Sequence, residues 1–151
     1  MLSRVIFLSF IILLTSTSFP QTGKRITHDD YDHWKNLSDA IISDDGSFLS
    51  WEINPQKGDG YLFIYDYAAE SYDSVRRGYD AGFSPSNDYL VFKIKPPYDT
   101  VRAAKLAGRK KKDLPGDSLG VYIFETGKLI KYPGLESFSL PEEESEWFAF
   151  M

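Results

Sequence analysis

Cysteine is absent from this chain of 151 residues, and histidine occurs only twice, as His28 and His33. Without cysteine the chain has no disulfide framework, no thiolate metal site, no thiol nucleophile and no attachment point for a lipid near its N-terminus. Two histidines leave few bases that could activate a serine. The sequence therefore excludes cysteine chemistry and predicts a fold held together by its core or by a larger assembly.

Long hydrophobic runs are also scarce, and the one that stands out is "VIFLSFIILL" from Val5 to Leu14. Arg4 precedes it and the small, polar stretch 15–21 follows it, which is the layout of a secretory signal peptide. Such a run covers about 15 Å as a helix, too short for a hydrocarbon core of about 30 Å. We predict that residues 1–21 are a signal peptide and that the protein is exported, to the periplasm or outside the cell, without stable membrane insertion after cleavage. The alternative is an uncleaved membrane anchor.

The chain has no excess of basic residues. Its formal net charge of −5 argues against a nucleic-acid interface over the whole chain. Aromatic residues, in contrast, are abundant: ten Tyr, eleven Phe and three Trp make up 16% of the sequence. Flat side chains pack well on a pleated surface, so this composition favours strands.

Short segments bounded by turn residues predict strands over most of the chain. The polar segment 22–39 precedes them, and its Tyr31, Trp34 and Leu37 are spaced by three. This spacing predicts one or two helical turns, or a segment that places its aromatic rings on a sheet. The predicted strands are Phe48–Ile53, Tyr61–Tyr67, Ser71–Arg76, Tyr89–Ile94, Leu119–Phe124 and Lys128–Tyr132.

Two of these strands belong to a repeat. "SDDGSFLSWEI", which begins at Ser43, is followed 41 positions later by "SPSNDYLVFKI", which begins at Ser84. A third copy begins in "ESEWFAFM", with Phe150 at the position that Trp51 has in the first copy. Phe150 lies 58 positions after its counterpart Phe92, which is 17 more than the period. An insertion in the second copy, over residues 99–115, accounts for the difference.

A period near 40 residues with about four short strands in each unit is typical of β-propeller blades. We therefore predict an all-β fold, namely the first two to three blades of a β-propeller with short four-stranded antiparallel sheets, after the signal peptide. The blade units are expected at about 40–80, at 81–136 with the basic insertion 99–115, and at 137–151, where a third blade begins. The alternative is two ordinary hairpins with similar turns.

The stretch "HDDYDH", from His28 to His33, contains two His and three Asp, which are ligand types for Zn or another divalent ion. The two histidines are five positions apart and do not share one face of a helix. We interpret the stretch as a solvated acidic segment. The sequence predicts neither a metal site nor a cofactor.

Serine catalysis has no recognisable site in the chain. No Gly-x-Ser-x-Gly motif occurs, and Ser118 in "LPGDSLG" lacks the small neighbours of a sharp strand-to-helix turn, so we predict that it leads into a strand. The acidic run from Glu142 to Glu146 is typical of a solvated turn. Neither a lysine nor a helix pattern follows Gly58-Asp59-Gly60, so it is no phosphate loop. We predict no catalytic residue within these 151 positions.

The insertion is strongly basic in its middle. Six cations within eleven residues could contact an acidic partner or an anionic lipid, but no aromatic residue alternates with them to stack bases. We interpret the segment as an exposed loop or short helix and predict no nucleic-acid partner. Asn36-Leu37-Ser38 matches an N-glycosylation acceptor, which matters only in a eukaryotic source. The six cations are Arg102, Lys105, Arg109, Lys110, Lys111 and Lys112.

Six motifs follow one another along the chain: "DHWKNL", "AIISDDGSFLSWEI", "NPQKGDGYLFIYD", "AGFSPSNDYLVFKIKPPYDTVRAAK", "KKKDLPGDSLGVYIFETGK" and "ESFSLPEEESEWFAF". In their order and spacing they resemble the start of a prolyl oligopeptidase-family serine peptidase of the type that Bacteroidetes-type bacteria export. The resemblance covers about residues 24–151. It implies a β-propeller after the signal peptide, and an α/β-hydrolase domain with a Ser-Asp-His triad downstream.

The resemblance implies that this chain is the propeller part, which filters peptide substrates and positions them at the mouth of the hydrolase domain. Nothing in the chain matches the triad, so no catalytic residue is carried over. Two alternatives remain: a small exported β-protein that binds a partner or ligand, in which Phe148 and Phe150 would be buried, and a propeller scaffold without enzyme activity. Since few blades leave sheet faces open, residues 22–151 alone are expected to aggregate or to stay partly unfolded.

Overall fold

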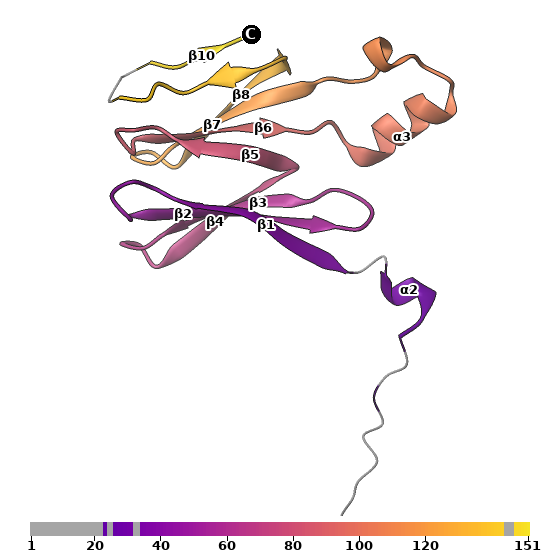
Figure 1. Ribbon diagram of the computed structural model, residues 1–151, viewed down its shortest axis with the longest axis horizontal. Coiled ribbons are helices and arrows are strands. Elements are labelled where there is room, and N and C mark those ends of the chain that lie inside the picture. Colours follow the sequence, from indigo (N-terminus) through magenta and orange to yellow (C-terminus); the bar gives the residue numbers. More distant parts are fainter. Residues whose placement is uncertain (1–22, 24–25, 32–33, 144–146) are drawn as a thin grey trace, which may run out of the picture.

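The computed structural model describes residues 23, 26–31, 34–143 and 147–151. Within them, two four-stranded antiparallel sheets account for most of the chain (Figure 1). In each sheet the order in space follows the order in sequence, and short turns join neighbouring strands except β6 and β7, which a longer segment connects. A ribbon of two short strands, β9 and β10, follows the second sheet. The strands are β1 (Lys35–Ile42), β2 (Phe48–Pro55), β3 (Tyr61–Asp66), β4 (Ser71–Arg76), β5 (Gly78–Phe83), β6 (Tyr89–Ile94), β7 (Asp117–Ile123), β8 (Lys128–Leu135), β9 (Phe138–Ser139) and β10 (Ala149–Phe150).

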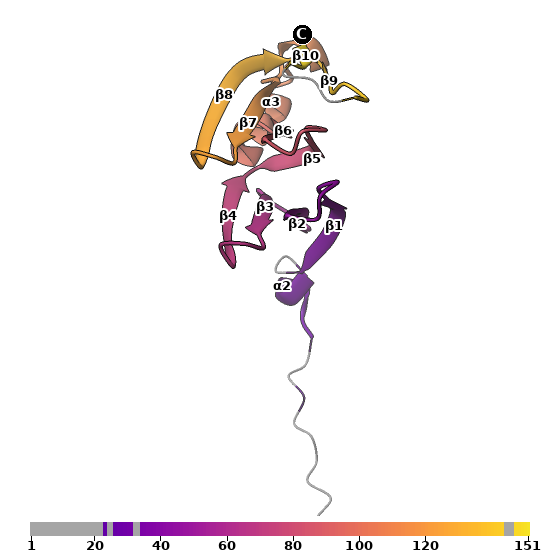
Figure 2. The same ribbon diagram turned by 90° about the vertical axis from the view of Figure 1, so that its left-hand side faces the viewer.

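The two sheets stack face to face, and Figure 2 shows β1 and β5 on one side of the stack and β4 and β8 on the other. The apolar side chains between the sheets form the main core. Alternation along the strands supplies this layer, because β3 and β6 each direct every second residue toward the other sheet. The buried residues of this core are Leu62, Ile64 and Val75 from the first sheet and Leu90, Phe92 and Ile94 from the second.

A second core covers the opposite face of the second sheet. Val91, Leu119 and Val121 are buried there. Side chains of the C-terminal segment, among them Phe138 and Phe148, pack against them. Each sheet is thus one layer in a stack of consecutive antiparallel meanders, which is the arrangement of neighbouring β-propeller blades. The predicted all-β fold with four-stranded blades is confirmed.

The 41-residue repeat is visible in the hydrogen bonds of the two blade turns. Ser43 and Ser84 are both buried, and in each the backbone N–H donates across the turn, to the carbonyl of Phe48 at 3.0 Å and of Tyr89 at 2.9 Å. Each serine Oγ accepts the N–H of that same aromatic residue, at 2.9 Å and 3.2 Å. The shared serine therefore closes equivalent turns, and the two segments are copies of one unit rather than unrelated hairpins.

Strands β1 and β5 escaped the sequence prediction because each contains a bulge. The register shifts between Ser38 and Ile41 in β1, and 41 positions later between Tyr79 and Gly82 in β5. At both bulges an aspartate takes a left-handed backbone, with φ of 51° at Asp39 and 52° at Asp80. A bulge breaks the alternation that marks a strand in a sequence.

The segment 22–39, expected to be helical or to cap a sheet, divides into two parts. Helix α2 (His28–Tyr31) provides one helical turn, and β1 begins at Lys35 and enters the first sheet. Tyr31 and Trp34 contact each other edge to face, with ring centroids 4.8 Å apart. Both are exposed, so these rings do not cover a sheet.

The insertion sits between β6 and β7 and leaves the strand register intact. Trp51 faces Phe63 in the first sheet, and its counterpart Phe92 faces Gly120 in the second. The first pair of counterparts is 41 positions apart and the second pair 57, so the insertion adds 16 residues. It forms α3 (Tyr98–Leu106) and a 3-10 turn, η1 (Lys111–Asp113), in agreement with the expected short helix.

The predicted signal peptide, residues 1–21, lies outside the described residues. In the part of the chain that the structure describes, no helix has the length and apolarity needed to cross a bilayer. Both findings leave export as a prediction from the sequence.

Candidate functional site

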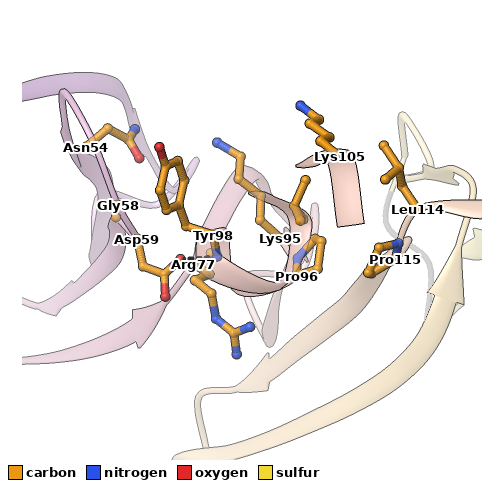
Figure 3. A pocket seen from close by; sticks show the side chains of 13 residues that line it. Asn54, Gly58, Asp59, Arg77, Lys95, Pro96, Tyr98, Lys105, Leu114 and Pro115 are labelled. Carbon is orange, nitrogen blue, oxygen red and sulfur yellow. Dashed lines mark hydrogen bonds between the residues drawn. The ribbon is translucent and has the colours of Figure 1, made fainter. Parts of the chain in front are cut away.

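A pocket of about 330 Å³ lies at the end of the stack where both sheets meet the insertion (Figure 3). Three segments form its walls: the β2–β3 turn of the first blade, the link from β4 to β5, and the insertion of the second blade. Its volume is in the range of small-molecule sites. The pocket depends on the insertion, because the equivalent connection in the first blade is a short turn.

The β2–β3 turn supplies one wall through Asn54, Asp59 and Gly60. A Cβ at Gly60 would lie 2.1 Å from Asn54 Oδ1 and 2.9 Å from the carbonyl oxygen of Ile53, so only glycine fits there. Asn54 is held by a hydrogen bond from its Nδ2 to Glu52 Oε2 at 2.9 Å. These contacts fix the turn against its own strand.

Arg77, in the link between the blades, has a left-handed backbone with φ of 67°. This conformation is uncommon for a residue with a long side chain and is strained unless the surroundings hold it. Two backbone hydrogen bonds do so: the Arg77 N–H donates to the Gly60 carbonyl at 2.8 Å, and the Lys95 N–H donates to the Arg77 carbonyl at 2.9 Å. The link therefore ties the turn of one blade to the strand end of the next.

The insertion closes the pocket with mostly apolar groups. Val101 and Lys105 of helix α3 line the pocket, and the N–H of Tyr98 at the start of the helix donates to Asp59 Oδ1 at 2.9 Å. The bond joins the insertion of the second blade to the turn of the first. The apolar part of the lining is Pro96, Val101, Leu114, Pro115 and the ring of Tyr98.

The charged groups of the lining are mainly cations. Asp59 is the carboxylate of the lining, its side chain is only 11% exposed, and its Oδ2 already pairs with Arg76 at 2.9 Å. No ion pair among the described residues neutralises Arg77, Lys95 or Lys105. The pocket is therefore cationic although the chain carries a net charge of −5.

Two of these cations have defined surroundings. Arg77 Nε is buried and has no hydrogen-bond partner among the described residues. The ammonium of Lys95 lies 4.4 Å from the ring centroid of Tyr79. In Figure 3 the ammonium groups of Lys95 and Lys105 lie on one side of the Tyr98 ring and the guanidinium of Arg77 on the other. The guanidinium of Arg77 thus points away from the ammonium groups of Lys95 and Lys105.

A more polar and more open pocket lies next to the first and shares Asn54 and Lys95 with it. Glu52, which is 4% exposed, accepts the N–H of Asp80 at 2.9 Å in this neighbouring pocket. Burial and a hydrogen bond to Asp117 raise the pKa of Tyr79 well above its usual range. These groups are bound to one another and form a structural network between the inner strands.

The stretch from His28 to His33 is only partly described, since Asp32 and His33 lie outside the described residues. His28 packs against Tyr31 at 5.8 Å between ring centroids, and Asp30 accepts the N–H and the hydroxyl of Thr27 at 2.8 Å and 2.9 Å. Among the described residues no group of three or more His, Asp or Glu could hold a metal ion. The absence of a metal site remains a prediction.

The other residues singled out in the sequence lie apart from each other. Ser118 lies inside β7, where it pairs with Ile94 and Pro133, whereas the sequence predicted that it precedes a strand beginning at Leu119. Glu142 and Glu143 are exposed, while Glu144 and Glu146 lie outside the described residues. Of the six cations in the insertion, Lys105 lines the pocket and Arg109 lines a shallower hollow on the other side of α3.

Sequence reasoning missed the pocket itself. The sequence predicts that Gly58-Asp59-Gly60 is no phosphate loop, and the same three residues form a wall of the pocket. Arg77 could not be found from the sequence, because nothing in a sequence shows that a residue other than glycine has a left-handed backbone.

Comparison with known proteins gives structural neighbours only. No family model matches the chain, and no curated protein matches it. Among solved structures it is similar to an acylaminoacyl peptidase from Pyrococcus horikoshii, with a TM-score of 0.48 and 12% identity over 72% of this chain and 16% of that one. It is also similar to the β-propeller domain of the Trilobed protease from Pyrococcus furiosus, with a TM-score of 0.45 and 13% identity over 70% of this chain and 31% of that one.

The chain thus spans less than a third of either solved structure. Identity and TM-score are low in both cases, so the fold rests on the strand pairing of the chain itself. That pairing defines the class of protein: an all-β chain of consecutive β-propeller blades.

Proposed function

We propose that this chain is the N-terminal propeller part of an exported serine peptidase, and that it filters and positions peptide substrates without being catalytic itself. The observation that carries the proposal is the pair of blades in one 41-residue repeat, with equivalent serine turns and equivalent bulges. The order of the six sequence motifs adds the peptidase family to this fold. The apolar run near the N-terminus supports export.

The first experiment reads the encoding DNA beyond codon 151 and sizes the native product by immunoblot. We expect the frame to continue and to reach a Gly-x-Ser-x-Gly motif with later Asp and His codons. A stop after Met151 together with a native product of this mass would remove the peptidase proposal.

Filtering is tested on the protein encoded by the longer frame. We expect the whole protein to cleave short peptides but not an intact folded protein, and the hydrolase part alone to lose this discrimination. Replacing the serine of the downstream motif by alanine serves as the control, because it abolishes both activities. Equal discrimination with and without the propeller would contradict a filtering role.

Export is tested with a fusion of residues 1–30 to a reporter that is active only outside the cytoplasm. We expect activity from the natural sequence and loss of activity with Ile11→Arg, because a charge in the apolar run prevents recognition as a signal peptide. An active Ile11→Arg fusion would contradict the signal-peptide prediction.

A second candidate, a propeller or small β-protein that binds a ligand, is favoured by the cationic pocket, which is formed entirely by described residues. The compact form of this candidate required Phe148 and Phe150 to be buried, and Phe150 is 47% exposed. The exposure of Phe150 therefore favours a ligand-binding propeller over a self-contained small ligand-binding domain.

A further inference from the structure

We propose that the pocket between the two blades and the insertion binds a carboxylate that carries an apolar group, the chemistry of the C-terminal residue of a peptide. This inference goes beyond the proposed function, because it assigns a site and a ligand class to this chain alone. It would stand if no hydrolase domain accompanied the propeller.

The charge of the lining selects an anion. Lys95 and Lys105 line the pocket without a described carboxylate partner, while Asp59 is already bound by Arg76 and by the N–H of Tyr98. A cation in a partly enclosed site interacts more strongly with an anion than it would in bulk water. A ligand with one negative charge compensates part of the positive charge of the lining.

The apolar lining selects an organic anion over an inorganic one. Pro96, Leu114 and Pro115 present no hydrogen-bond donor to the ligand, and the Tyr98 ring adds a flat apolar surface (Figure 3). Phosphate prefers sites built from several convergent donors, such as backbone N–H groups or paired arginines. A carboxylate with an apolar side chain matches both kinds of surface in this pocket.

The test is equilibrium dialysis of the full chain against the tripeptide Ala-Ala-Phe with a free carboxylate, and against the same tripeptide with a C-terminal amide. We expect saturable binding of the acid, with a Kd on the order of a millimolar. The amide should bind about tenfold more weakly, because it lacks the charge-assisted interaction. Equal affinity for the two tripeptides, or no saturable binding of either, would overturn the proposal.

Variants locate the site. Lys105→Gln should weaken binding of the acid about tenfold and leave the amide unchanged, since one charge-assisted hydrogen bond is lost. Lys111→Gln is the matched control, because Lys111 is in the same insertion but does not line the pocket. Equal effects of the two substitutions would show unspecific attraction to the basic segment and overturn the assignment.

A competition arm keeps the result interpretable. Competition by inorganic phosphate at the same concentration as the acid should be absent. If phosphate displaces the acid fully, the site is a general anion site and the carboxylate assignment fails.

Discussion

The two blades share one repeat but differ in what covers them. In the second blade Leu90, Phe92 and Ile94 are buried between the sheets. Their counterparts 41 positions earlier lie on the face of the first sheet that points away from the second, and none of them is fully buried. The same strand pattern is therefore core in one blade and surface in the other, and the neighbouring sheet decides which.

The first blade partly compensates with its own aromatic residues. Trp51 stacks on Phe63 with ring centroids 5.3 Å apart, and Tyr61 and Tyr72 contact the same phenylalanine. In the second blade Gly120 takes the position of Phe63, and the ring of Phe92 fills the space that a side chain there would occupy. We call the four rings of the first blade, Trp51, Tyr61, Phe63 and Tyr72, the outer aromatic face.

The largest effect is expected on self-association. The outer aromatic face exposes Tyr72 to 65% and Tyr61 to 41%, so the chain without residues 1–21 should form concentration-dependent oligomers in sedimentation. Substituting both by lysine should restore a monomer. Tyr132→Lys is the control, because Tyr132 is similarly exposed (42%) but belongs to the second blade. A soluble monomer with a sharp two-state melt before any substitution would contradict this prediction.

The second largest effect is a difference in stability loss between substitutions at the two equivalent aromatic positions, Phe92 and Trp51. Phe92→Ala should lower the free energy of unfolding by about 3–5 kcal/mol, as expected for a fully buried ring. Trp51→Ala should cost about 1 kcal/mol, because Trp51 is only partly covered. Urea unfolding in the monomeric lysine background measures both. Equal losses would mean that the two faces are equally buried in solution.

A smaller effect concerns the glycine that faces Phe92. Gly120→Ala should lower the free energy of unfolding by about 1–3 kcal/mol, because the new Cβ would lie 2.4 Å from Phe92 Cε2. Gly116→Ala is the matched control, since no atom lies within 4 Å of a Cβ at that position. If both variants unfold at the same urea concentration, the tight contact is absent in solution.

The smallest effect is a pH dependence of the contact between blades. Tyr122 of the second blade donates a hydrogen bond to Asp73 of the first, and burial, followed by this bond, raises the pKa of Tyr122 to about 12. The unfolded chain has the ordinary value near 10. Since the folded state favours the neutral phenol, its contribution is complete below about pH 10 and is lost as the pH rises through the folded value.

Unfolding by urea at about pH 8 and about pH 11 measures this contribution, because the two values lie on either side of the unfolded pKa. The stability difference between the natural chain and Tyr122→Phe should shrink at the higher pH. Both chains are measured in the monomeric lysine background, so that self-association does not enter the comparison. A difference that is independent of pH would contradict the role of the Tyr122 hydroxyl.

The sequence was sufficient for features that depend on local pattern. Ser71–Arg76 and Tyr89–Ile94 were predicted with their observed ends, and the insertion was expected to be 17 residues where the register requires 16. The additional position lies in the longer turn between β9 and β10. Periodicity and turn residues carry this information because each acts on its nearest neighbours in the chain.

Features that depend on distant contacts were not predictable. The bulges at Asp39 and Asp80 interrupt the alternating sequence pattern of β1 and β5, so these strands were not predicted. The composition does not show that these two aspartates have a positive φ. The pocket required Tyr98 and Asp59 to meet across the two blades, 39 positions apart. Such pairs follow from the stacking of the sheets and not from either segment alone.

The insertion lengthens one connection of the second blade without moving any strand that follows. From Ser118 onward, strands β7 and β8 keep the pairing of β3 and β4, and an irregularity separates this run from the pair of Asp117 and Leu135. The strands therefore specify the layer, and the connection between β6 and β7 can change in length and charge without changing the register of these strands. A foreign loop grafted between Lys95 and Gly116 would inherit a rigid platform at no cost to the register, which makes this position a natural acceptor for new binding specificities.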